Sequence, residues 1–247
     1  MMKKVFFASD FHLGTPDEAS SLVREKKIVE WLNAAAIDAE CIYLVGDLFD
    51  FWFEYKHAVP RGYTRLLGTL SHLRDRGIRI EIFTGNHDMW MFDYLEKECG
   101  LIIHRKPILI EYQGKKIFLG HGDGLGPGDH GYKFLKKVFA NPFCQWLFAR
   151  LHPNLGIGMA NFWSRKSRAT AAEKDRFKGE EHEWLLIYSK EQLLLQSDID
   201  YFIFGHRHLP LDLQVSDSVR YVNLGDWFSK CTYAVLENGK LELKSFS

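Results

Sequence analysis

Five short clusters of Asp, His and Asn contain the side chains of this chain that are best suited to catalysis. They are Asp10-Phe11-His12, Gly46-Asp47-Leu48-Phe49-Asp50, Gly85-Asn86-His87-Asp88, Gly120-His121-Gly122-Asp123 and Gly205-His206-Arg207-His208. Seven of these side chains are candidate metal ligands: Asp10, His12, Asp47, Asn86, His121, His206 and His208. Carboxylate, imidazole and amide donors suit a divalent transition ion such as Mn, Fe or Zn. Seven donors are too many for one catalytic ion with an open position, so they predict two ions that share a carboxylate.

Each cluster follows an apolar run of strand length. The runs are Lys4–Ser9, Cys41–Gly46, Arg79–Thr84, Lys116–Gly120 and Tyr201–Gly205, and helical patterns lie between the first ones at Ser21–Ala36, Tyr63–Arg76 and Met89–Glu98. Alternation of strands and helices is typical of an α/β sheet. Loops at the carboxyl ends of strands in such a sheet converge on one crevice, so we expect the five clusters to meet there.

The pattern changes to short strands near the C-terminus. They are expected at 210–216, 218–224, 231–237 and 240–246, and Asn238-Gly239 predicts a tight hairpin turn between the last two. The fold class is therefore α/β with antiparallel strands added. A length of 247 residues fits one domain over 1–247.

A basic, aromatic segment interrupts this order. Residues 130–172 contain seven Lys or Arg, eight aromatic residues and no acidic residue, whereas the rest of the chain has 25 basic and 32 acidic residues. Pro142 and Pro153 are expected to divide the segment into short helices. We interpret it as part of a helical cap at 125–185, inserted between two strands. The net charge of zero argues against a general polyanion binder, and no nucleic-acid partner is expected.

Cysteine spacing and apolar runs indicate the compartment. The four cysteines lie at long, irregular intervals, which favours reduced thiols over a disulfide framework. The apolar run at the N-terminus is too short for a signal peptide, and no window is apolar enough to span a membrane. We expect a cytoplasmic protein.

The five motifs DxH, GDxxD, GNHD, GHGD and GHRH closely resemble those of the calcineurin-like metallophosphoesterase superfamily. The resemblance implies a four-layer αββα sandwich with a dimetal centre. It assigns Asp10, His12, Asp47 and His208 to one ion, and Asp47, Asn86, His121 and His206 to the other. It also implies that His87 acts on the phosphate as a donor or general acid oriented by Asp88, and that Asp50 helps to position nearby groups. Asp123 either holds His121 or is a simple turn residue.

The insertion indicates which phosphoester is cleaved. Its basic residues suit a diphosphate, and its aromatic residues suit acyl chains or a membrane surface, although they also suit the core of a small cap. The arrangement resembles the UDP-2,3-diacylglucosamine pyrophosphohydrolase family of lipid A synthesis, in a Bacteroidetes-type variant.

That resemblance implies attack of a metal-activated water on the α-phosphate of UDP-2,3-diacylglucosamine, which gives UMP and 2,3-diacylglucosamine 1-phosphate. It further implies two divalent ions, of the Mn²⁺ type with Fe or Zn as alternatives, and a peripheral position on the cytoplasmic face of the inner membrane. The expected substrate-binding residues are Asp129, Tyr132, Ser164, Arg165, Lys166 and Arg168. The best-known members have Arg at the position of His87.

Two other functions stay open. The chain is either a phosphoesterase of the same fold that acts on a soluble nucleotide or a phosphoprotein, or a scaffold that has lost catalysis. The second alternative is disfavoured because every expected ligand position is filled.

Overall fold

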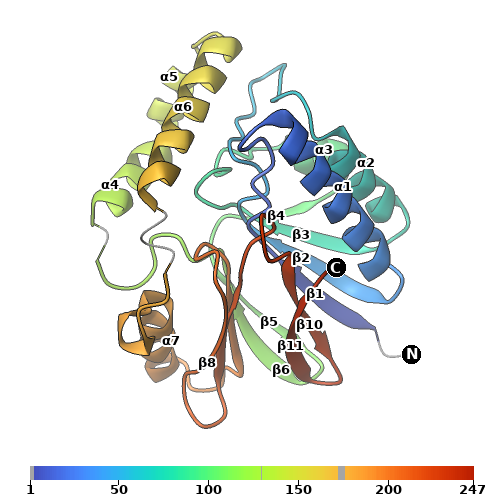
Figure 1. Cartoon of the computed structure of the whole chain (residues 1–247), viewed down its shortest axis with the longest axis vertical. Helices are drawn as coiled ribbons and strands as arrows, with labels where there is room; N and C mark the ends of the chain where they lie inside the picture. The colour runs from blue at the N-terminus through green and yellow to red at the C-terminus, as the bar shows by residue number, and fades with distance from the viewer. Residues whose placement is uncertain (1–2, 129, 172–175) are drawn as a thin grey trace.

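The computed structural model describes residues 3–128, 130–171 and 176–247, and it leaves out the side chains of residues 161 and 165–171. Two β-sheets face each other at its centre (Figure 1). The first has the strand order β11-β10-β1-β2-β3-β4. Strands β1 to β4 are parallel to one another, whereas β10 is antiparallel to both of its neighbours, β1 and β11. Its strands are β1 Lys4–Ala8, β2 Ala39–Val45, β3 Arg79–Phe83, β4 Ile102–His104, β10 Thr232–Glu237 and β11 Lys240–Ser245.

The second sheet has the order β5-β6-β7-β9-β8, in which β6, β7 and β9 run parallel between two antiparallel edge strands. Its strands are β5 Ile108–Tyr112, β6 Lys115–Leu119, β7 Tyr201–Phe204, β8 Pro210–Gln214 and β9 Arg220–Leu224. Both sheets are mixed, so the predicted combination of parallel and antiparallel strands is confirmed. The turn at Asn238-Gly239 joins β10 to β11, and both of its residues have positive φ.

Helices cover the outer face of each sheet and complete four layers (Figure 1). Helices α1 Glu18–Ala35, α2 Thr64–Asp75 and α3 Tyr94–Cys99 pack on the first sheet, and α7 Trp184–Leu195 packs on the second. Alternate residues of β1 explain this arrangement, because Val5 and Phe7 join the core between the sheets while Phe6 and Ala8 join the core under α1 and α2. A strand covered on both faces is apolar throughout, as the strand-length runs in the sequence are.

The insertion forms three helices that project beyond the two sheets (Figure 1). They are α4 His130–Phe139, α5 Pro142–Phe148 and α6 Pro153–Ala171, followed by the short helix η1 Glu180–His182. Pro142 and Pro153 are the first residues of α5 and α6, as their fixed φ favours. The expectation of short helices is wrong for α6, which has 19 residues. That the segment is a lipid-binding cap stays a prediction.

An aromatic cluster joins the insertion to the body. Phe51, Phe53 and Trp90 are buried there and pack against Phe139 of α4 and Phe148 of α5. The Trp90 indole also donates a hydrogen bond to the carbonyl oxygen of Phe139, at 2.9 Å. Among the helices that the structure describes, none has the length and apolar character needed to cross a bilayer.

One predicted helix starts in the wrong place. The pattern over Met89–Glu98 was expected to be helical throughout, but α3 begins only at Tyr94. The Glu54 carboxylate accepts hydrogen bonds from the backbone N–H groups of Phe92, Asp93 and Tyr94, at 2.6, 2.6 and 3.0 Å. A carboxylate at the first N–H groups of a helix stabilises that end, and here it comes from a distant loop. Strands β4 and β5 and helix α7 were not predicted.

Candidate metal centre

All seven candidate ligands lie just beyond the carboxyl ends of parallel strands from both sheets. Asp10 and His12 follow β1, Asp47 follows β2, Asn86 follows β3, His121 follows β6, and His206 and His208 follow β7. Because the two sheets face each other with these ends on one side, the five loops converge as the sequence predicted. The side chains form two groups.

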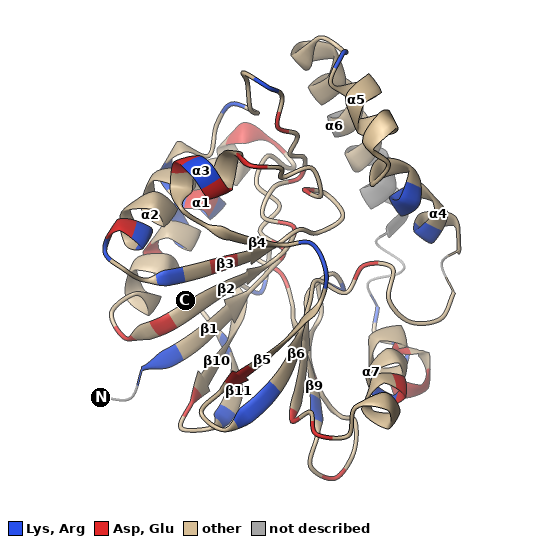
Figure 2. Cartoon of the chain, turned by 180° about the vertical axis from the view of Figure 1, so that it is seen from behind, with Lys and Arg blue, Asp and Glu red and all other residues tan. Residues whose placement is uncertain are grey.

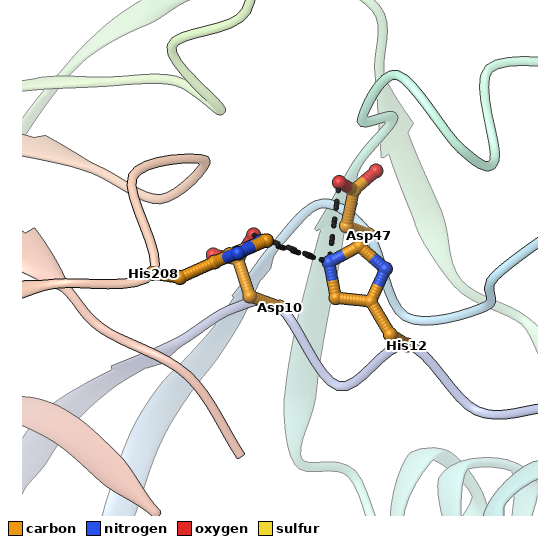
Figure 3. A group of neighbouring side chains, drawn as sticks. All are labelled: Asp10, His12, Asp47 and His208. Atoms are coloured by element: carbon orange, nitrogen blue, oxygen red, sulfur yellow. Dashed lines mark hydrogen bonds and ion pairs between the residues drawn. The ribbon is translucent and has the colours of Figure 1, made fainter. Parts of the chain in front are cut away.

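The first group contains Asp10, His12, Asp47 and His208, which point toward one another in Figure 3. One donor atom from each of the four lies within 4.8 Å of the others. The Nε2 atoms of His12 and His208 are 3.0 Å apart, and His12 Nε2 is 3.5 Å from Asp47 Oδ2. His208 Nε2 is 3.3 Å from Asp10 Oδ1. Two imidazoles and two carboxylates directed at one point form a donor set suited to a divalent cation.

The second group contains Asp47, His121 and His206, whose donor atoms also lie within 4.8 Å of one another. His121 Nε2 is 3.3 Å from Asp47 Oδ2 and 3.3 Å from the amide oxygen of Asn86. Asp47 belongs to both groups, so its carboxylate is placed where a bridging ligand of two ions would be. That the two groups hold two separate ions stays a prediction.

The backbone of the centre is strained in a way that is typical of functional loops. Five candidate ligands have positive φ although none is glycine: Asp10, His12, Asp47, His206 and His208. Such conformations persist only where surrounding contacts hold them. Glycines beside the ligands leave the necessary space, since a Cβ on Gly85 would collide with the Asp47 carboxylate and one on Gly205 would lie 2.5 Å from Asp10 Oδ2.

Hydrogen bonds fix the direction of the ligand atoms. His121 Nδ1 lies 2.8 Å from the carbonyl oxygen of Val45, so Nδ1 carries the hydrogen and Nε2 is left to bind a cation. The Asp10 carboxylate accepts hydrogen bonds from the backbone N–H of His206, at 3.0 and 3.2 Å, and from the Ser9 hydroxyl. Ser9 was not predicted to take part, because a serine at a strand end is common in sequences.

The buried Asp and His side chains of the centre shift one another's pKa values. Burial acts to raise the pKa of Asp47, but the neighbouring His121, His87 and His12 lower it well below its usual value. Burial acts to lower the pKa of His121, but the Asp47 carboxylate raises it to about 10. Burial together with the charge of His121 lowers the pKa of His206 to about 4. Opposite pKa shifts within one buried cluster of carboxylates and imidazoles are typical of a functional site.

His87 lies at the edge of the first group. Its ring is 4.8 Å from that of His12, and its Nδ1 is 3.0 Å from the backbone carbonyl oxygen of Asp50. Ser164, which comes from α6 of the insertion, donates a hydrogen bond to Asp50 Oδ2 at 2.9 Å and lies 3.3 Å from His87 Nδ1. The insertion therefore reaches the site through Ser164.

Asp88 is fully buried beneath the same loop. Its carboxylate accepts hydrogen bonds from the backbone N–H groups of Gly85 and Leu48, both at 2.7 Å, and of Asp47 at 3.3 Å. These bonds join the loop after β3 to the loop after β2. They support a role for Asp88 in holding both loops, and its expected role in orienting His87 stays a prediction.

The remaining predicted residues belong to the insertion. The Tyr132 hydroxyl donates to the Asp123 carboxylate at 2.5 Å, and Lys136 forms an ion pair with the same carboxylate at 2.6 Å. Asp123 is thus more than a turn residue, since it anchors α4 two positions after His121. Asp129 lies outside the residues that the structure describes, as do the side chains of Arg165, Lys166 and Arg168.

The comparison with protein families decides the assignment. The model of the calcineurin-like phosphoesterase family matches residues 3–210, which include all seven candidate ligands. The chain belongs to the calcineurin-like phosphoesterase family. Membership of this family, together with the grouped His and Asp side chains, indicates that the protein binds divalent metal.

Named relatives of this phosphoesterase are similar over almost their whole length. A protein of Porphyromonas gingivalis named UDP-2,3-diacylglucosamine hydrolase is 39% identical, with 99% of this chain and 98% of the relative covered. A protein of Aeromonas hydrophila with the same name is 28% identical, with 96% of each chain covered. Among solved structures, Yfce, a phosphoesterase from E. coli, has a TM-score of 0.48 and 17% identity, with 98% of this chain and 92% of that chain covered.

Proposed function

We propose that this phosphoesterase hydrolyses the pyrophosphate bond of UDP-2,3-diacylglucosamine and releases UMP and 2,3-diacylglucosamine 1-phosphate. The observation that carries the proposal is the 39% identity, over 99% of the chain, with a relative that bears the name UDP-2,3-diacylglucosamine hydrolase. The structure supports it, because an aromatic and basic insertion lies beside the two groups of metal ligands. A substrate in which a diphosphate is joined to a lipid needs the metal ligands and an apolar surface next to each other.

The donor set fits two divalent ions. In the proposal, Asp10, His12 and His208 would hold one ion, Asn86, His121 and His206 would hold the other, and both would share Asp47, with Mn²⁺ as the native metal. Bound ions of this kind attract the phosphate, polarise its oxygen atoms and lower the pKa of water to about 7. Two buried carboxylates leave such a centre with excess positive charge for an anionic substrate.

His87 is the group of the chain that we place on the leaving oxygen or on the phosphate. A carbonyl oxygen can only accept, so the contact with Asp50 requires a hydrogen on Nδ1 of His87. Nε2 can then donate to the substrate only when the ring is protonated. In that charged form the ring can pair with the Asp50 carboxylate, whose Oδ1 lies 3.7 Å from His87 Nδ1. Ser164 donates a hydrogen bond to the Asp50 carboxylate and therefore helps to hold it beside His87.

The insertion supplies the surface for the lipid in this proposal. Phe134, Phe143, Trp146, Phe162 and Trp163 are each more than half exposed. Figure 2 shows Lys and Arg on α4, with no acidic residue in the described parts of α4, α5 and α6. Exposed aromatic residues beside basic ones suit the interface of an anionic membrane, so we extend the proposal to peripheral association with the cytoplasmic face of the inner membrane.

A cavity of about 300 Å³ opens beside the second group of ligands. His121, Asp123 and Lys136 contribute to its wall, so it connects the metal centre with α4 of the insertion. Part of an elongated substrate can occupy this space while its phosphate lies at the ligands. We therefore place part of the substrate in this cavity.

The test is hydrolysis by the purified full chain in the presence of Mn²⁺. Release of UMP from UDP-2,3-diacylglucosamine is expected, with UDP-N-acetylglucosamine, which lacks the acyl chains, cleaved far more slowly. Asp47→Ala serves as the inactive control. Absence of UMP release by a chain that binds Mn²⁺ would refute the substrate. Equal rates with the acylated and unacylated sugars would favour a phosphoesterase for soluble nucleotides.

A further inference from the structure

A buried ion pair lies directly behind the ligands after β7. Arg207 stands between His206 and His208 in sequence, and its side chain is almost completely buried. Its Nε atom donates to both carboxylate oxygens of Glu183, at 3.1 and 3.2 Å. Glu183 is also buried, and it accepts a further hydrogen bond from the Tyr221 hydroxyl at 3.2 Å.

The guanidinium of Arg207 has a second restraint. Its central carbon lies 4.1 Å from the centre of the Trp184 ring, a distance at which a cation is attracted to an aromatic face. A planar guanidinium held by a carboxylate and stacked on a ring has a fixed orientation, which an ammonium group would not have. The side chain of Arg207 is therefore a rigid connection between the loop after β7 and the start of α7.

Stability alone is a poor explanation for this pair. Removing two charges from water costs several kcal/mol per ion, so apolar residues in the same volume often stabilise a fold equally well. The loop that carries Arg207, however, is strained, with φ of 69° at His206 and 53° at His208. Residues in this conformation persist only where surrounding contacts hold them. Asp10 accepts a hydrogen bond from the backbone N–H of His206, and the anchored side chain of Arg207 is a second restraint, placed between the two ligands.

We propose that Arg207, held by Glu183, is a positioning residue for both halves of the metal centre. It presents His206 to the second group of ligands and His208 to the first. Glu183 is the residue that follows η1 and precedes α7, so the same pair fixes the point where the chain returns from the insertion. The inference rests on the proposed metal centre but not on the identity of the substrate.

The experiment measures Mn²⁺ binding rather than turnover alone. Calorimetry gives the stoichiometry and Kd, and electron paramagnetic resonance distinguishes paired from isolated Mn²⁺. Arg207→Lys and Glu183→Gln are expected to weaken Mn²⁺ binding about 10- to 100-fold, the usual effect of losing a group that orients a ligand. The spectrum of paired ions should decrease in proportion.

Arg220→Lys is the matched control. Arg220 also pairs with a carboxylate, that of Asp212, and its guanidinium lies 5.7 Å from the centre of the Tyr201 ring in the same sheet. It has no metal ligand beside it in sequence, so its variant should bind Mn²⁺ like the wild type. If the variants at Arg207 and Glu183 lose thermal stability but bind two Mn²⁺ with wild-type affinity, the pair is only structural and the inference is wrong.

A double variant covers the case in which one unpaired buried charge prevents folding. Glu183→Gln combined with Arg207→Met removes both charges and retains side chains of similar length. It is expected to fold and still bind Mn²⁺ at least 10-fold more weakly. Wild-type affinity in this variant would overturn the inference.

Hydrogen exchange on the unaltered chain gives an independent result. Because the pair joins the ligand loop to α7, Mn²⁺ should slow exchange at Trp184–Leu186 as well as at His206–His208. If Mn²⁺ slows exchange only at His206–His208, the ion pair does not link the ligand loop to α7, and the inference is wrong even if every variant fails to fold. A wild-type chain that binds no Mn²⁺ would instead refute the metal centre itself.

Discussion

Ser164→Ala separates two roles for a residue of the insertion. The sequence pattern assigned Ser164 to the substrate, whereas in the structure its hydroxyl donates to Asp50 Oδ2 at 2.9 Å and lies 3.3 Å from His87 Nδ1. Ser164 is only 9% exposed, so water cannot easily replace the lost donor. A hydrogen bond to a charged group contributes about 1.5–3 kcal/mol.

The variant should therefore be less stable by about 1.5–3 kcal/mol. Each kcal/mol lowers the Tm of a domain of 150–250 residues by about 2–4 °C, so we expect a decrease of roughly 3–12 °C. Because Asp50 also faces His87, kcat should decrease about 10-fold while KM changes little. Thermal unfolding followed by circular dichroism and steady-state kinetics with Mn²⁺ measure both effects.

The control is Ser189→Ala in α7. Ser189 is also buried, but its hydroxyl donates to the carbonyl oxygen of Leu185 one turn earlier in the same helix. Its loss should lower the Tm without changing kcat. If Ser164→Ala keeps the wild-type Tm and raises KM alone, Ser164 binds substrate as the sequence suggested, and the positioning role is refuted.

Three further predictions concern the centre, the sheets and the insertion. Asp47→Ala should reduce kcat roughly 1000-fold or more and lower the number of Mn²⁺ ions bound per chain, because both ligand groups share Asp47. Near-normal turnover would contradict the role of Asp47 as a ligand shared by two ions. Burial acts to raise the pKa of Glu81, but His104 and Arg79 together lower it below its usual value of 4.5. The ionised Glu81 carboxylate therefore stabilises the fold above pH 4.5, and this stabilisation is lost as the pH falls through the pKa that Glu81 has in the folded protein. Glu81→Gln should therefore lower stability at pH 7 and flatten its acid dependence, as urea unfolding from pH 7 to 3 would show. Trp146→Ser should change the free energy of unfolding by no more than about 0.5 kcal/mol, because the ring is half exposed. The variant should co-sediment less with anionic vesicles. A large decrease in Tm would instead mean that the ring belongs to a core.

The strands that carry the site were predictable because most of their residues are buried, almost throughout β1, β2, β3 and β7 and on one face of β6. Each gives an apolar run whose end is marked by a polar cluster, and the five runs correspond to β1, β2, β3, β6 and β7. The start of α3 was not predictable, since the Glu54 carboxylate that holds its first N–H groups lies 40 residues before Tyr94. No local pattern contains that contact.

Ligand types and their order were visible in the sequence, but the groups around them were not. The carbonyl oxygen of Val45 that orients His121 is a backbone atom, which no residue type reveals. Arg207 was visible within GHRH, yet only the structure shows that its partner is Glu183, 24 residues earlier. Motifs report which atoms can bind a metal, whereas long-range contacts determine their direction.

The insertion is tied to the metal centre at both ends. Near its start, Asp123 follows His121 by two residues and accepts from Tyr132 and Lys136 of α4. Near its end, Glu183 holds Arg207 between two ligands. Both anchors therefore lead to ligand loops of the second sheet, the loops that follow β6 and β7. The contacts of Asp123 and Glu183, rather than the exposed aromatic residues, thus connect these two ends of the insertion to the ligand loops.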